Sequence, residues 1–221
     1  FPNIQAEFDG DSENIFNCID NTKAILIIGT GSVLFIKDQN KKVRFGGWGY
    51  LLDNFGSGYD YGKEAIKVYL QDSELNVNNS LITTLISNDN YDPEQLLKDV
   101  YNQEKSYIAS FAHYVFDAYQ KDDEIAKNII ENNVNYYVSL IKNVIKNYPA
   151  VTSIVASGGI VDNYGEILFK QIKNKININF IVSDLPQIFG ACKKCVSNHF
   201  SVNKEFETNF INYYKELKNH E

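Results

Sequence analysis

The sequence predicts an α/β protein in which a mixed sheet carries helices on both faces. Short apolar segments separated by turns stand near the start of the chain and favour a small meander of strands. A long middle section has apolar residues at helical spacing, and the last third alternates strand patterns with helix patterns. The 221 residues are 44% hydrophobic and 14% aromatic, which is enough apolar material for a sizeable core and too much for a disordered chain.

The predicted meander consists of three strands bounded by turn residues. Residues 24–28 form a continuous apolar run that ends in a glycine turn. Residues 33–37 follow that turn, and residues 43–45 follow a polar turn at 38–42. Consecutive short strands joined by turns of this length favour antiparallel pairing.

The middle section predicts a series of helices from about residue 60 to 148. Apolar residues recur at i, i+3 and i+4 over 106–120 and 122–147, which predicts two of the longer helices. Pro93, among acidic residues, suits the first turn of another helix, and Pro149 ends the series.

The last third alternates strands and helices. A strand is predicted over 152–156, a helix over 162–174 and a strand with alternating Ile and Asn over 176–182. Helix follows from residue 185, and an amphipathic closing helix is predicted over 202–219. This alternation favours a sheet with helices packed on its faces.

Charge and hydropathy exclude two classes of partner. The formal net charge is -7, and no Lys/Arg cluster offers the electrostatic footprint that a nucleic acid requires. The mean hydropathy is -0.30, and the apolar runs are far shorter than the roughly 20 residues that span a bilayer. We therefore expect neither a nucleic acid nor a membrane as partner.

Three cysteines, an odd number, do not make a disulfide framework and predict a reducing, cytoplasmic location. Cys192, Cys195 and His199 have a metal-like spacing, and Cys18 could complete a set of four ligands. The same spacing arises when small residues share one face of a helix, and we prefer that interpretation, so no metal site is predicted. His113, among aromatic residues, is interpreted as a packed helix residue.

Two glycine-rich turns follow predicted strands. Gly29-Thr30-Gly31-Ser32 suits a phosphate, because glycines let the backbone approach an anion and the hydroxyls add donors without charge. Ser157-Gly158-Gly159 stands between a strand and a helix, where the helix N-terminus favours phosphate or a nucleotide. A plain β-turn and a plain strand-to-helix turn are the alternatives.

The only tryptophan, Trp48, stands among Gly46, Gly47 and Gly49. An aromatic ring flanked by glycines suits a surface that receives a flat ligand such as a sugar ring, and the alternative is a core Trp beside a flexible turn. Asp9, which precedes the meander, is a helix cap or turn residue on its own, and a candidate proton acceptor only beside a phosphate site.

The order of these motifs resembles that of the N-acetylglucosamine kinase family, within the superfamily of sugar kinases, heat-shock chaperones and actin. The resemblance covers nearly the whole chain. The family has an Asp some twenty residues before a GTGS turn, then GGWG and GDEGSG elements, and Asp9 stands 20 residues before Gly29. The segments 109–126 and 184–191 are similar to further helix elements of the family. The resemblance implies a ribonuclease H-like (actin-like ATPase) lobe.

The resemblance also implies roles for individual residues. Asp9 would be the general base for the sugar hydroxyl. The residues implied at the nucleotide are Thr30, Gly31, Ala118, Gly158, Gly159 and Asn163. The residues implied at the sugar are Ser32, Gly47, Trp48, Gly49 and Asn54. ATP and Mg²⁺ are the implied cofactors, and an amino sugar is the implied partner.

The same resemblance divides the chain into two parts. Residues 1–23 would be the end of an N-terminal lobe and the crossover, and residues 24–221 the C-terminal nucleotide-binding lobe with its helical insert. The family's first phosphate loop, an Asp-Gly-Gly-x-Thr-type turn in the N-terminal lobe, has no counterpart in the 221 residues. Because the chain starts at Phe1 and contains no Met, we expect that Phe1 is not the native start.

One departure from the family concerns the sugar site. Asp53-Asn54-Phe55 stands where the family has Gly-Asp-Glu, so an amide replaces an acid that would bind the sugar. An amide both donates and accepts hydrogen bonds, but it carries no charge.

The predicted function is ATP-dependent phosphorylation of N-acetylglucosamine or a related hexosamine, and two alternatives stay open. One is a related ATPase that activates a partner enzyme, which would need an iron–sulfur cluster at a subunit interface and has only Cys192 and Cys195 as paired thiols. The other is a sugar- or nucleotide-binding protein in which the change at 53–55 marks lost catalysis. The sequence also leaves open whether two copies form a homodimer.

Overall fold

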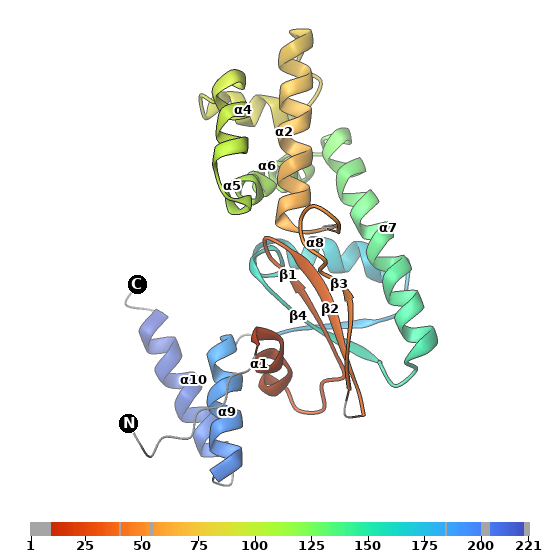
Figure 1. Ribbon diagram of the computed structural model, residues 1–221, viewed down its shortest axis with the longest axis vertical. Helices are drawn as coiled ribbons and strands as arrows, with labels where there is room; N and C mark the ends of the chain where they lie inside the picture. Colours follow the sequence, from red (N-terminus) through yellow and green to blue (C-terminus); the bar gives the residue numbers. More distant parts are fainter. Residues whose placement is uncertain (1–9, 40, 54, 184, 200–203, 219–221) are drawn as a thin grey trace.

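The computed structural model describes residues 10–39, 41–53, 55–183, 185–199 and 204–218 (Figure 1). Within these residues, a five-stranded mixed sheet has the order β3-β2-β1-β4-β5. Its strands are β1 (Ala24–Ile28), β2 (Ser32–Asp38), β3 (Lys41–Gly46), β4 (Ser153–Ser157) and β5 (Asn179–Val182). Strand β2 is antiparallel to both of its neighbours, β1 and β3, whereas β4 pairs parallel with β1 and β5 pairs parallel with β4.

Strand β1 is the centre of the sheet. Its register pairs Ile28 with Ser32 on the antiparallel side and Ile25 with Val155 on the parallel side. All of its residues except Ile27 are buried, as expected for a continuous apolar strand that is covered on both faces.

We call the described helices between β3 and β4 the insert. They are α2 (Gly58–Leu75), α3 (Leu81–Asn88), α4 (Pro93–Asn102), α5 (Lys105–Ser110), α6 (Ala112–Gln120) and α7 (Glu124–Asn147). Most of them lie in the upper part of Figure 1, and α7 runs from there down beside the sheet. Side-chain caps begin four of these helices: Ser57, Ser80, Asp92 and Asp123 each accept a hydrogen bond from a backbone N–H of the first turn. Pro93 stands in the first turn of α4, as predicted.

Helices cover both faces of the sheet, which confirms the predicted layers. On one face, Leu26, Ile28 and Leu34 belong to the main core together with side chains of α2, α6, α7 and α8 (Gly159–Lys173). On the other face, Ile25 packs with Phe16 of α1 (Asp11–Cys18) in a second, smaller core.

The end of the chain packs against α1 rather than against the insert. Helix α9 (Gln187–His199) approaches α1 so closely that a Cβ at Gly190 would lie 1.8 Å from the carbonyl oxygen of Asn14. Helix α10 (Lys204–Lys218) adds Phe210, whose ring contacts that of Phe189. Of the two adjacent tyrosines of α10, Tyr213 is 69% exposed, and Tyr214 contacts Phe210, so Tyr214 is the inward-facing one.

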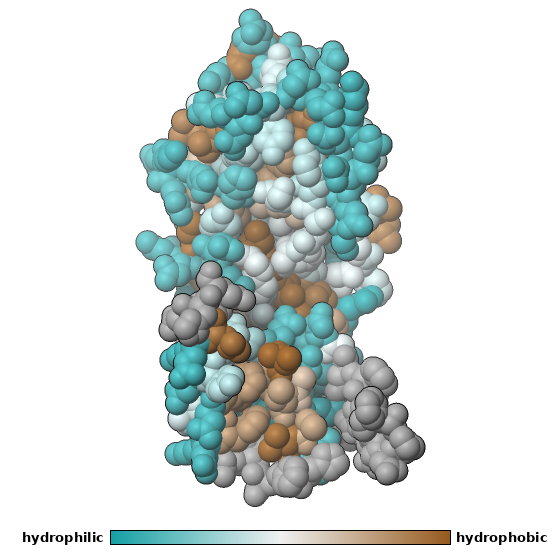
Figure 2. Space-filling model, turned by 90° about the vertical axis from the view of Figure 1, so that its left-hand side faces the viewer, coloured by the Kyte–Doolittle hydropathy of each residue, from teal (hydrophilic) through white to brown (hydrophobic). Residues whose placement is uncertain are grey.

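Hydrophilic side chains dominate the upper part of the face shown in Figure 2, where the insert lies, and apolar side chains gather lower down, where α9 and α10 lie. None of the helices in the described ranges combines the length and the apolar character needed to cross a bilayer.

The largest differences between the predicted and the observed elements concern three helices and one strand. The helix predicted over 106–120 is two helices separated at Phe111, and the short helix α1 was not predicted at all. The helix predicted from Asp162 begins three residues earlier, at Gly159. The strand predicted from Ile176 begins at Asn179, because the N–H of Ile176 still donates to Ile172 at the end of α8.

Candidate functional site

The two predicted glycine turns meet at one edge of the sheet. Because β1 and β4 are neighbouring parallel strands, their carboxyl ends lie side by side. A Cβ at Gly158 would lie 2.5 Å from the carbonyl oxygen of Ile28 and 3.2 Å from the nitrogen of Gly29. Gly158 also has a φ of +114°, which side chains rarely adopt. Glycine at 158 is therefore required both by its own backbone and by the adjoining turn.

The N-terminus of α2 also holds the glycine turn at 29–32, by hydrogen bonds to its backbone carbonyls. The N–H of Gly58 donates to the carbonyl of Gly29 at 2.7 Å, and the N–H of Tyr59 donates to that of Thr30 at 3.1 Å. Helices α2 and α8 thus both begin beside the two turns. Helix N-termini favour anions because their first N–H groups and the helix dipole present positive charge. The first N–H groups of α2 are already bound to carbonyl and hydroxyl oxygens, so α8 is the helix whose N-terminus suits an anion.

A cavity of about 390 Å³, which we call the insert-side cleft, adjoins these turns. It is lined by Gly29, Thr30, Gly58, Ser106, Ala109, Ser110, Ala112, His113, Gly159, Ile160, Asn163 and Tyr164. Three residues implied at the nucleotide therefore line one cleft, namely Thr30, Gly159 and Asn163. The amide nitrogen of Asn163 donates to the carbonyl of Gly159 at 2.7 Å, so it supports the first turn of α8.

Two aromatic residues of the insert-side cleft were not predicted as site residues. Tyr164 stacks on Phe116 with ring centroids 4.0 Å apart, and burial raises the pKa of its hydroxyl. His113 packs against Tyr114, as the sequence predicted, and it also lines the cleft. Both reach the cleft from helices far apart in the chain, and residue spacing carries no signal for that.

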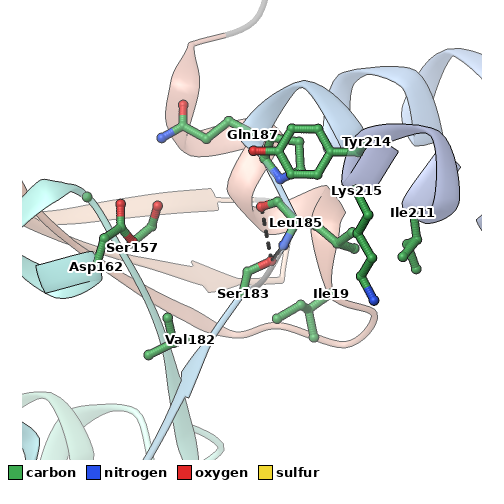
Figure 3. A pocket seen from close by; sticks show the side chains of 12 residues that line it. Ile19, Ser157, Asp162, Val182, Ser183, Leu185, Gln187, Ile211, Tyr214 and Lys215 are labelled. Atoms are coloured by element: carbon green, nitrogen blue, oxygen red, sulfur yellow. Dashed lines mark hydrogen bonds between the residues drawn. The ribbon is translucent and has the colours of Figure 1, made fainter. Parts of the chain in front are cut away.

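A second cavity of about 1030 Å³, which we call the strand-end cavity, lies beyond β4 and β5 (Figure 3). Ser157 and Asp162 line it on the β4 side, and Ser183, Tyr214 and Lys215 line it opposite them. Consecutive glycines therefore line different cavities, because Gly158 faces the strand-end cavity and Gly159 the insert-side cleft. The turn between β4 and α8 separates the two.

The glycine-flanked tryptophan lies on the surface. Trp48 is 61% exposed, so the alternative of a core Trp is wrong. Gly46, Gly47 and Gly49 all have positive φ, which gives the turn a shape that side chains would strain. The guanidinium of Arg44 lies 4.0 Å from the centroid of the Trp48 ring, a cation–π contact.

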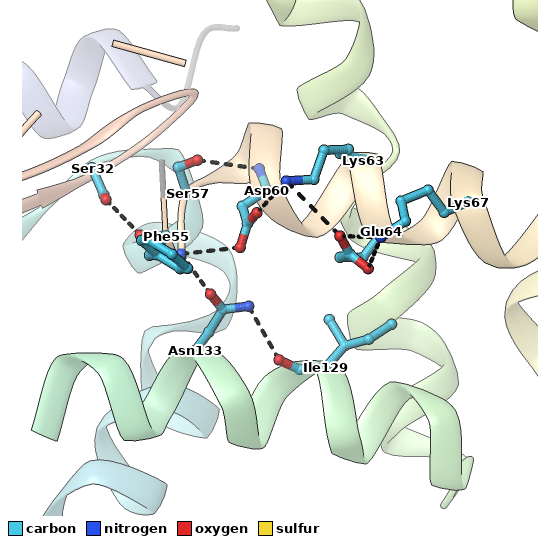
Figure 4. A network of polar contacts seen from close by, with 10 residues as sticks. Ser32, Phe55, Ser57, Asp60, Lys63, Glu64, Lys67, Ile129 and Asn133 are labelled. Carbon is cyan, nitrogen blue, oxygen red and sulfur yellow. Dashed lines mark hydrogen bonds and ion pairs between the residues drawn. The ribbon is translucent and has the colours of Figure 1, made fainter. Parts of the chain in front are cut away.

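A buried polar network holds the segment between Trp48 and α2 (Figure 4). The side chain of Asn133 on α7 accepts from the N–H of Gly56 at 2.7 Å and donates to the carbonyl of Ile129 at 3.1 Å. The hydroxyl of Ser32 donates to the carbonyl of Phe55 at 2.6 Å. Ser32 therefore ties the first glycine turn to this segment, so the implied sugar residues and the first turn form one structural unit.

Among the implied residues that the structure describes, six line neither the strand-end cavity nor the insert-side cleft, namely Gly31, Ser32, Gly47, Trp48, Gly49 and Ala118. Ala118 is fully buried in the main core, on the face of α6 that packs against other helices, and it lines neither cavity. The structure therefore places Ala118 in the main core, and its implied contact with a nucleotide stays a prediction. Asp9 and Asn54 lie outside the described residues.

The described residues include no group of three His, Cys, Asp or Glu side chains that could hold a metal ion. The cysteines are free thiols: Cys18 is buried, Cys192 is half-buried and Cys195 is exposed. Burial raises the pKa of the Cys18 thiol, although a backbone hydrogen bond and the charge of Lys193 oppose that effect.

Comparison with known proteins places this geometry in context. A model of the BadF/BadG/BcrA/BcrD ATPase family matches residues 3–192. An N-acetylmuramic acid/N-acetylglucosamine kinase of Clostridium acetobutylicum is 28% identical over 177 residues, which cover 73% of this chain and 56% of that protein. An N-acetyl-D-glucosamine kinase of Dictyostelium discoideum is 28% identical over 166 residues, which cover 71% of this chain and 52% of that protein. The chain thus spans about half the length of the curated relatives it matches.

Solved structures show the same fold. A candidate N-acetylglucosamine kinase of Chromobacterium violaceum superimposes with a TM-score of 0.67 at 16% identity, over 82% of this chain and 62% of that chain. Another, from Porphyromonas gingivalis, superimposes with a TM-score of 0.65 at 17% identity, over 85% of this chain and 64% of that chain. Together with the sheet order, these matches confirm the predicted fold.

Proposed function

The chain belongs to the BadF/BadG/BcrA/BcrD ATPase family, and from this premise we propose that it binds ATP across its two glycine turns and serves phosphoryl transfer to a hydroxyl of an amino sugar. The observation that carries the proposal is the backbone contact between Gly158 and the turn at Gly29. It brings two turns and two helix N-termini to one point, with a cavity on either side.

We assign the nucleotide to the insert-side cleft and to the place where the two glycine turns meet, which we call the ridge between Gly29 and Gly158. A Cβ at Gly31 or Gly159 would meet nothing within 4 Å, so the protein itself leaves space above both glycines. That space suits a phosphate chain near the N-terminus of α8. Tyr164 and His113 offer ring surfaces to a nucleoside, and the volume of the cleft is in the range of small-molecule sites.

Mg²⁺ bound with ATP would supply positive charge that neutralises the charge developing on the phosphates during phosphoryl transfer. Such a Mg²⁺ needs only one or two carboxylates from the protein, because phosphates and water complete its coordination. Asp162, beside Gly158 in the strand-end cavity, is the described carboxylate that would hold it.

The acceptor sugar is assigned to the segment that carries Ser32, Gly47, Trp48, Gly49 and Asn54. N-acetylglucosamine and the related N-acetylmuramic acid are the acceptors that the relatives support. Asp9 would take the proton from the reacting hydroxyl as general base. Exposed Trp48 offers an apolar surface for one face of the sugar ring.

The test is release of ADP from Mg-ATP with a panel of amino sugars, compared with the rate without sugar. We expect ADP release to depend on the sugar. Sugar binding without ADP release would instead select the binding-protein alternative. An iron–sulfur absorption band in anaerobically prepared protein would select the activator alternative, for which Cys192 and Cys195 of α9 are the candidate ligands.

Nucleotide binding has a sharper test in Gly159→Ala. The added methyl group meets no protein atom within 4 Å, so the fold should be unaffected, but it would occupy space assigned to the nucleotide. We expect the affinity for ATP to fall by about tenfold or more, the effect of losing roughly one good hydrogen bond and its contact. Gly165→Ala on the same helix, outside the insert-side cleft, should leave the affinity unchanged. Unchanged affinity in Gly159→Ala would refute the assignment.

A further inference from the structure

Two residues that occur once each in the chain lie against each other at the assigned acceptor site. Arg44 is the only arginine and Trp48 the only tryptophan of the 221 residues. The guanidinium of Arg44 lies 4.0 Å from the centroid of the indole ring, and the ring is still 61% exposed. One face of the ring is therefore covered by a cation, and much of the remaining surface is open.

Arg44 has no carboxylate partner among the described ion pairs, whereas two nearby lysines have one. Lys37 and Lys42 share the carboxylate of Glu13, each at 3.0 Å. No ion pair within the described ranges includes Arg44, whose one described interaction is the contact with Trp48. Its five N–H donors can form paired hydrogen bonds with a carboxylate in a way that an ammonium cannot.

The register places this cation on the acceptor side of the site. Arg44 lies on β3 opposite Phe35, which belongs to the sheet face covered by α1. Strand β3 is two strands away from β1, a separation of about 10 Å. Phosphates at the ridge between Gly29 and Gly158 would therefore lie well away from β3, whereas a sugar beside Trp48 would lie next to Arg44.

We propose that Arg44 and Trp48 together select an amino sugar that carries a carboxylate. The open surface of the indole stacks against the sugar ring, and the guanidinium donates hydrogen bonds to the carboxylate. This inference rests on the proposed function, because it concerns the acceptor of that reaction. It assigns the choice between a neutral and an acidic amino sugar to one residue that the resemblance did not single out.

The test uses the fluorescence of Trp48, which reports binding without any catalytic turnover. The chain is titrated with N-acetylglucosamine and with N-acetylmuramic acid, which bears a lactyl carboxylate. We expect the acidic sugar to bind about fivefold more tightly, as an exposed ion pair allows. Arg44→Gln should abolish that preference but retain the binding of the neutral sugar. Lys41→Gln, which removes a charge from the same strand, should keep the preference.

The outcomes separate this inference from the proposed function. Equal affinity for the two sugars, unchanged by Arg44→Gln, would overturn the inference alone. No fluorescence response to either sugar, with nucleotide bound, would overturn the proposed acceptor and the inference with it. A titration with ADP forms a third arm: if Arg44→Gln weakens ADP binding and leaves both sugars unaffected, the guanidinium serves a phosphate and the inference is wrong.

Discussion

A Cβ built at Gly158 would lie 2.5 Å from the carbonyl oxygen of Ile28. This approach joins the end of β4 to the end of β1 at backbone distance, so neither turn can move without the other. The strand-end cavity and the insert-side cleft meet at this contact. The geometry of the candidate site thus depends on a contact in which no side chain takes part.

Gly158→Ala should destabilise the fold. The methyl group would overlap the Ile28 carbonyl, and the φ of +114° would strain any residue with a side chain. We expect the free energy of unfolding to fall by about 2–4 kcal/mol, measured by urea denaturation. Gly159→Ala, the matched control, should change it by less than about 0.5 kcal/mol. Equal stability of the two variants would contradict the close contact.

Asn133→Leu should destabilise the segment that precedes α2. The substitution removes the acceptor at 2.7 Å from the buried N–H of Gly56 and leaves it only the longer contact of 3.5 Å with the carboxylate of Asp60. A buried donor that loses its partner costs about 1–3 kcal/mol, to be measured as the loss in free energy of unfolding. Exposed Asn132 on the same helix gives the control Asn132→Leu, for which we expect little change. A similar loss in both variants would show that the Gly56 contact contributes nothing.

The free energy of unfolding should depend on pH in the acidic range because of Glu13. Burial raises the pKa of the Glu13 carboxyl, but hydrogen bonds and charges from Lys37 and Lys42 outweigh it and hold the pKa below its ordinary value of 4.5. A pKa lowered by folding stabilises the fold above the unfolded value, and that contribution is lost as pH falls through the folded value. Wild type should therefore exceed Glu13→Gln in stability at neutral pH, and the gap should close below pH 4.5. Denaturation at several pH values tests this, and a constant gap would contradict it.

Tyr61→Phe should leave the fold as stable or make it more stable. The hydroxyl of Tyr61 is fully buried and has no hydrogen-bond partner among the described residues, while its ring packs on Phe116. Removing an unpaired buried hydroxyl is neutral or gains about 1 kcal/mol, measured by thermal or urea denaturation. Tyr114→Phe, which breaks a hydrogen bond to Asp89, should instead lose stability. A loss in Tyr61→Phe of the same size would show that its hydroxyl is hydrogen-bonded after all.

The strands near the start could be predicted closely because local chemistry determines them. Residues 24–28 form an unbroken apolar run, and the observed β1 has the same bounds. The polar turn after residue 37 separates β2 from β3 without ambiguity. Apolar residues at helical spacing, together with Pro93 in a first turn, explain why most helices of the insert were also predicted.

Boundaries set by tertiary contacts could not be predicted. Phe111 carries no Gly or Pro signal, yet the helix breaks there. Helix α1 has no side-chain cap hydrogen bond at Gly10 and is stabilised by packing on α9 and β1. Helix α8 begins at Gly159 because Gly158 takes a left-handed φ beside β1, and the sequence does not reveal that neighbour.

The glycine motifs of the candidate site could be predicted from the sequence, but the set of residues that line its cleft could not. The glycine turns at 29–31 and 157–159 were each identified from composition and position after a strand, but their contact follows from the pairing of β1 with β4, which was not predicted. Ala118 illustrates the limit, because helical periodicity alone does not tell which side of α6 faces the core. His113 and Tyr164 became part of a cleft only through the packing of α6 against α8.

The contact between Gly29 and Gly158 joins residues that stand 129 positions apart in the chain. Loops of that length close slowly, because chain entropy is lost when their ends are brought together, before the contact between the ends contributes any stabilising free energy. The intervening helices can fold early from local contacts, whereas β4 must find β1 across all of them. We expect the capacity to bind nucleotide to appear only in the last kinetic phase of refolding, after most of the helical structure has formed.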